Sequence, residues 1–156
     1  MPVSDSAAKK CRPLPPPDQL AKLVSNVTET MLRITFLPSN EAPPPVPLTW
    51  RMAVLPTTGA HSLGIGLSSD EPGCRTLGAA MFGVAASEVD ESMLDDALRE
   101  LVNMTAGVVK GLVDPDAALG LPTVHRNGQA PGVELTAQST VLRAKDLGLV
   151  LWIYEA

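Results

Sequence analysis

One stretch of the sequence, from Asp90 to Pro115, restricts the fold more than any other, because its apolar residues recur at helical spacing. At about 100° per residue, one side of the predicted helix collects these positions: Leu94, Ala97, Leu98, Leu101, Met104, Thr105, Val108 and Leu112. Asp90 or Ser92 can cap its start, and Asp114-Pro115 ends it. Such a helix must pack its apolar side on a core and leave a polar stripe in solvent.

The chain ends in a predicted strand, Leu149–Tyr154, whose residues are apolar at even and odd positions alike. This is typical of a central strand that lies beneath helices. The strand forms a hairpin with Val133–Arg143, and Gly148 in the turn between them is free to adopt a positive φ. A second predicted hairpin consists of the strands Leu48–Leu55 and His61–Ser68 with a turn at 56–60.

Two more helices complete the predicted elements. The first begins with Asp18 as its N-cap, and its apolar residues again recur at helical spacing. The second, Cys74–Phe82, is short and is closed by Gly83 in the C′ position. Residues 113–132 are predicted to be a loop. The order helix, hairpin, helix, helix, hairpin predicts an α+β fold with helices packed on one face of an antiparallel sheet.

Proline determines the predicted domain organisation. Most of the 15 prolines lie in two segments, 1–18 and 38–47. Because proline donates no backbone hydrogen bond and forces its neighbours into extended conformations, residues 1–18 are predicted to be a flexible leader. Residues 19–156 are predicted to form a single domain. Within it, 38–47 is predicted to be a loop, either an ordinary linker or a docked polyproline segment.

Composition excludes several classes of function. A net charge of −5 and 3% aromatic residues provide neither attraction to nucleic acid or anionic membranes nor a stacking platform for bases. No apolar run approaches the roughly 20 residues that span a membrane, and the N-terminus lacks an apolar signal region, so we expect a cytoplasmic protein. Cys11 and Cys74 are expected to be reduced thiols, and His61 and His125 lack metal-ligand spacing, so we expect no metal site.

The polar stripe of the long helix carries the candidate chemistry. Its members are Asp96, Glu100, Asn103, Gly107 and Lys110. Glu100 and Asn103 are spaced i, i+3, so they project side by side, and together they could accept a cation of a partner and orient a water. A solvated helix face with a chance Glu–Asn pair is the alternative interpretation.

Other catalytic patterns find less support. The sequence has no GxSxG, no Walker loop and no complete GxGxxG. A paired-carboxylate hydrolase that uses Asp95, Asp96 and Glu100 stays open. However, Asp95 and Asp96 point about 100° apart on a helix, and their place near its start fits the helix dipole better.

Three segments together resemble the CheC/CheX/FliY family of chemotaxis phosphatases. Asp96–Gly107 is similar to the signature helix of that family, which reads Glu-x-x-Asn-Met followed by a small residue and Gly. Gly78–Gly83 resembles the segment that precedes this helix, and Leu119–Val124 followed by Gly128 resembles the loop that follows it. The resemblance covers roughly 50–154. It is nearest to CheX, because the first helix offers Asn26 and Glu29 only in the reverse order.

The resemblance implies an α+β fold and hydrolysis of the phosphoaspartate on a CheY-like response regulator. Asn103 would orient the attacking water, and Glu100 would pair with a lysine in the active site of the partner. Asp96, Arg99, Gly107 and Lys110 are the candidate contacts with the partner; the alternatives are a solvated flank for Asp96 and Arg99 and a tolerated mid-helix glycine for Gly107. The partner would supply the Mg²⁺, so no cofactor of the chain itself is expected. The resemblance also implies a homodimer. A non-catalytic domain that binds a response regulator or a flagellar-switch-like partner is the alternative.

Overall fold

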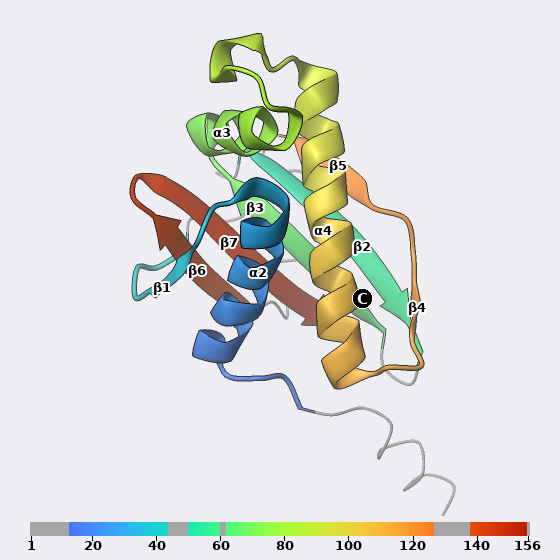
Figure 1. Ribbon diagram of the computed structural model, residues 1–156. Helices are drawn as coiled ribbons and strands as arrows, with labels where there is room; N and C mark the ends of the chain where they lie inside the picture. The colour runs from blue at the N-terminus through green and yellow to red at the C-terminus, as the bar shows by residue number, and fades with distance from the viewer. Residues whose placement is uncertain (1–12, 44–49, 60–61, 127–137, 156) are drawn as a thin grey trace, which may run out of the picture.

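The computed structural model describes residues 13–43, 50–59, 62–126 and 138–155. In this part of the chain, three α-helices cover one face of a seven-stranded sheet, as Figure 1 shows. Every pair of neighbouring strands is antiparallel. The predicted α+β fold, with helices on one face of an antiparallel sheet, is therefore confirmed.

The strands are β1 (Leu37–Ser39), β2 (Arg51–Thr58), β3 (Leu63–Ser69), β4 (Ala118–Leu119), β5 (Thr123–Arg126), β6 (Gln138–Ala144) and β7 (Leu147–Glu155). Their order across the sheet is β1-β6-β7-β3-β2-β4, and β5 also pairs with β2. The C-terminal strand β7 lies in the middle of this order, as predicted. Its residues 149–153 are buried on both faces.

The helices are α2 (Pro17–Leu32), α3 (Glu71–Phe82) and α4 (Glu91–Val113), with a short 3-10 helix, η2 (Ala86–Glu88), before α4. Asp90 caps α4, because its carboxylate accepts the backbone N–H of Met93 at 2.9 Å. Gly83 closes α3 at φ 67°, where a Cβ would be strained. Both predicted caps are confirmed.

Two predicted helix starts are wrong. The N-cap of α2 is Pro16, and Asp18 lies inside the first turn, where its charge still favours the helix dipole. Helix α3 begins at Glu71, three residues before Cys74, because Asp70 accepts the N–H of Gly73 at 2.8 Å. Cys74 is consequently a buried core residue, and burial raises the pKa of its thiol to about 12.

Short strands account for most of the other differences between the predicted elements and those of the structure. Strand β1 overlaps the start of the predicted proline-rich loop 38–47, and β4 and β5 lie in the predicted loop 113–132. Strand β2 continues through Pro56 to Thr58, where we expected a turn. The positive φ of the last hairpin belongs to Lys145, at 58°, because Gly148 already pairs with Arg143 in the sheet.

Several predictions fall outside the described residues. They concern the leader up to residue 12 with Cys11, the prolines at 44, 45 and 47, the start of the first predicted strand at 48–49, His61, and the segment 127–137. The helices that the structure describes include none long and apolar enough to cross a membrane.

The main core lies between the helices and the sheet. Helix α4 contributes Leu94, Leu98 and Leu101, all nearly inaccessible, and packs on α2, α3 and β2. A second cluster lies on the other face of the sheet and contains Met52, Val54, Val141, Val150 and Trp152. The predicted apolar side of α4 is buried at its first half, but Val108 and Leu112 are only half-buried and Met104 is 42% exposed. The second half of α4 instead buries Val102, Ala106, Val109 and Val113.

Candidate functional site

The candidate site is the outer face of α4, which the packing of its inner face directs away from the core. Asp96, Glu100 and Asn103 are exposed there, and Gly107 and Lys110 are half-buried. In an α-helix, residues i and i+3 lie about 4.5 Å apart along the axis and about 60° apart around it. The backbone of α4 therefore places the side chains of Glu100 and Asn103 next to each other on the surface, as the spacing predicted.

The fold gives the side chains of Glu100 and Asn103 no interaction partner among the described residues. Neither side chain forms a hydrogen bond or an ion pair with another residue of the described part. Asp96, in contrast, binds Arg99 at 3.0 Å between Oδ1 and Nη1. Glu100 is thus an uncompensated carboxylate beside a free carboxamide, a pair that can bind a cation and hydrogen-bond a water at once.

The two remaining stripe residues have different local roles. The ammonium of Lys110 donates to the carbonyl oxygen of Pro115 at 2.5 Å, so it stabilises the end of α4. A Cβ at Gly107 would meet no atom within 4 Å. Nothing in the described chain therefore requires glycine at this position, although glycine costs a helix up to about 1 kcal/mol relative to alanine.

Asp95 is separated from this stripe by the packing of α4. Its Oδ1 lies 3.1 Å from Nη1 of Arg51, and its Oδ2 accepts from Nη2 of Arg126 at 2.8 Å. Asp95 therefore faces β2 and β5, whereas Asp96 and Glu100 face solvent. The paired-carboxylate alternative finds no support, because the three carboxylates do not converge on one point.

Arg51 is the centre of a charged cluster that sequence reasoning missed. Its side chain is 3% exposed, binds Glu91 at 2.6 Å as well as Asp95, and lies 4.4 Å from the centroid of the Trp50 ring. The cluster connects the N-terminal third of α4 to the two strands beside it. No local pattern predicts it, since Arg126 and Asp95 lie 31 positions apart in the chain.

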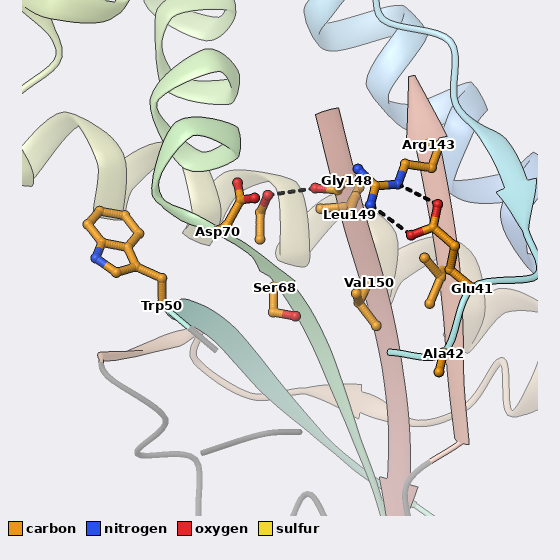
Figure 2. A pocket seen from close by; sticks show the side chains of 11 residues that line it. Glu41, Ala42, Trp50, Ser68, Asp70, Arg143, Gly148, Leu149 and Val150 are labelled. Carbon is orange, nitrogen blue, oxygen red and sulfur yellow. Dashed lines mark hydrogen bonds and ion pairs between the residues drawn. The ribbon is translucent and has the colours of Figure 1, made fainter. Parts of the chain in front are cut away.

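A cavity of about 320 Å³ lies elsewhere, and Figure 2 shows the side chains that line it. Its charged groups already serve the fold. Arg143 binds both carboxylate oxygens of Glu41, at 2.8 and 3.1 Å, and Asp70 caps α3. No lining residue belongs to α4. Among the described residues, no group of three or more His, Cys, Asp and Glu side chains could hold a metal.

Comparison with known proteins agrees with the resemblance. The family model "Chemotaxis phosphatase CheX" matches residues 51–143. The structure of CheX from Vibrio vulnificus has a TM-score of 0.69 and 18% identity, and the match covers 88% of this chain and 93% of that chain. No curated protein sequence matches the chain significantly.

Two further structures have the same fold at low identity. CheX from Desulfovibrio desulfuricans has a TM-score of 0.66 and 15% identity, covering 88% of this chain and 99% of that chain. The CheX–CheY–BeF₃–Mg²⁺ complex from Borrelia burgdorferi has a TM-score of 0.66 and 13% identity, covering 87% and 94%. The family match extends over more than half of the sequence and includes all of α4, and on that ground the chain belongs to the CheX family of chemotaxis phosphatases.

Proposed function

We propose that this protein hydrolyses the phosphoaspartate of a CheY-like response regulator, with Glu100 and Asn103 as its catalytic residues. One observation carries the proposal: on α4 of a CheX-family chain, an exposed Glu–Asn pair at i, i+3 has no partner in the described structure. The related Borrelia protein is known in a complex with CheY. A side-chain pair that the fold does not use is available to such a partner.

The reaction requires only positioning from this chain. A water attacks phosphorus in line, the bond between phosphorus and the aspartate oxygen breaks, and the products are inorganic phosphate and the carboxylate. The carboxamide of Asn103 can accept a hydrogen bond from the water and direct its lone pair toward phosphorus. A Mg²⁺ bound by the partner would neutralise negative charge on the phosphoryl oxygens, and we assign no residue of this chain to bind it.

The charges along the polar stripe favour Glu100 as the residue that forms an ion pair with the partner and so fixes how the partner is positioned on α4. Asp96 is compensated by Arg99, and Lys110 is engaged by the Pro115 carbonyl. Glu100 is consequently the acidic group of the stripe that is free to pair with a lysine of the regulator. A charge-assisted hydrogen bond of this kind contributes about 1.5–3 kcal/mol.

The direct test measures the decay of a phosphorylated CheY-type regulator with and without this protein. We expect decay at least about tenfold faster, which corresponds to a barrier about 1.4 kcal/mol lower. If the protein binds the regulator and decay is not accelerated, the catalytic proposal fails and the non-catalytic binding domain is supported.

Substitution of Glu100 by glutamine should weaken the encounter with the regulator. The variant keeps the shape of the side chain and removes its charge, so we expect KM for the phosphorylated regulator to rise about tenfold or more, with a smaller change in kcat. Glu29→Gln is the control, because Glu29 is exposed on α2 and its replacement changes the net charge equally. Equal KM values for the two variants would contradict the role of Glu100.

Substitution of Gly107 by alanine should change stability and activity in opposite directions. The added methyl meets no atom of the described chain, so the free energy of unfolding should rise by up to about 1 kcal/mol. If the regulator approaches α4 closely one turn beyond Asn103, activity should nevertheless fall. Gly111→Ala is the matched control. Gly111 lies one turn further on, and a Cβ there would also meet no atom within 4 Å. This variant should be more stable than wild type and fully active.

A further inference from the structure

Leu121 is the most exposed large apolar side chain of the described residues, at 84%. It lies between β4 and β5, in a segment where sequence analysis predicted only a loop. Folding gains almost nothing from a leucine in this state, because its apolar surface remains in water. Its apolar surface is therefore available to a partner.

The loop that carries Leu121 is held rigidly. The backbone N–H of Gly120 donates to the Pro56 carbonyl at 2.7 Å, and a Cβ at Gly120 would lie 2.7 Å from Cγ of Pro56. On either side, Leu119 pairs with Thr57 and Thr123 with Val54. Pro122 further restricts the residue before it to extended conformations. The backbone of such a loop is pre-organised for binding, since little backbone entropy is left to lose.

Two contacts between α4 and the segment that follows it indicate which part of the helix lies beside Leu121. The chain leaves α4, turns, and runs back beside it, as Figure 1 shows. At one end Pro115 accepts from Lys110, and at the other Arg126 binds Asp95. Leu121 lies about halfway along the returning segment, and Asn103 lies about halfway between the two helix residues. Counting residues between the two contacts, we infer that Leu121 lies at about the level of Asn103.

Met104 provides apolar surface on the other side of the pair. At about 100° per residue, Met104 lies about 100° from Asn103 around the helix, and Asp95 lies about 80° from it in the opposite direction. Asp95 faces β5 through its bond to Arg126. Met104, 42% exposed, consequently points away from the strand side, so Asn103 lies on the helix surface between Met104 and the side that faces β5.

We propose that Met104 and Leu121 are the apolar anchors of the docking surface for the response regulator, one on each side of Glu100 and Asn103. This inference rests on the proposed function. A standard interface covers roughly 800 Å² on each partner, a patch about 16 Å in radius, so a surface centred on Asn103 reaches the neighbouring loop. The regulator must then present apolar surface on both sides of its phosphorylation site.

The test measures affinity separately from turnover. The probes are a phosphorylated CheY-type regulator for KM and the same regulator activated with beryllofluoride and Mg²⁺ for Kd. Leu121→Ser and Met104→Gln should each raise both constants about tenfold and leave kcat unchanged. Leu37→Ser is the control, because Leu37 is 66% exposed on the edge strand β1 and should bind like wild type. Unfolding midpoints verify that all three variants are folded.

The outcomes separate this inference from the proposed function. If the wild type binds the regulator and Leu121→Ser binds equally well, the apolar anchors are refuted and the proposed function is unaffected. If the wild type binds without accelerating decay, catalysis is refuted and the Kd values still test the anchors. If the wild type does not bind any CheY-type regulator, both proposals fail together.

Discussion

Replacement of Asn103 by alanine should abolish most of the acceleration of phosphoaspartate decay and leave binding of the regulator largely intact. In the proposed reaction, the Asn103 carboxamide acts on the attacking water and contributes little to the ground-state complex. Loss of one pre-organised hydrogen-bonding group in such a site typically costs about 10²–10³ in rate. We therefore expect kcat to fall by about 100-fold or more, with Kd for the beryllofluoride-activated regulator close to that of wild type.

The matched control for this prediction is Asn26→Ala. Asn26 is exposed on α2 and is followed three residues later by Glu29, so the same change of residue type is made on another helix of the same protein. The control should retain full activity. If Asn103→Ala retained wild-type kcat, Asn103 would not orient the water. Loss of binding and turnover together would instead assign Asn103 to docking.

The candidate site was accessible to sequence reasoning because everything that forms it is local. The capping residue Asp90, the apolar spacing and the i, i+3 relation of Glu100 to Asn103 all belong to one helix. Helical periodicity determines which side of such a helix faces the core once a sheet is available to cover. The error at Met104 has the same origin, since the width of the buried side depends on the neighbouring elements and not on α4 alone.

The strands that sequence analysis missed depend on partners distant in the chain. Strand β1 contains Pro38, which cannot donate to a neighbour, and it forms only because β6 supplies pairing from one side. Strands β4 and β5 are short and mostly exposed, so they lack apolar alternation. Both exist because the edge of β2 is available to them. Leu121 owes its fixed position to the same pairing.

The charged cluster at Arg51 provides the largest expected effect on stability. Asp95→Ala would leave Arg51, 3% exposed, with Glu91 as its remaining carboxylate partner and would free Arg126. Removing one partner of a buried ion pair is strongly destabilising, because the other charge stays desolvated. We expect a loss of about 3 kcal/mol in the free energy of unfolding, or roughly 6–12 °C in Tm for a domain of this size.

The neighbouring residue is the control for this effect, because Asp96→Ala removes an ion pair of similar length from the surface. Its bond to Arg99 is exposed on both sides and should contribute less than about 1 kcal/mol. The double variant Arg51→Met with Asp95→Leu separates charge from packing: if the orphaned guanidinium causes the loss, removing both charges should restore much of the stability. Equal unfolding midpoints for Asp95→Ala and Asp96→Ala would show that the cluster does not hold α4 on the sheet.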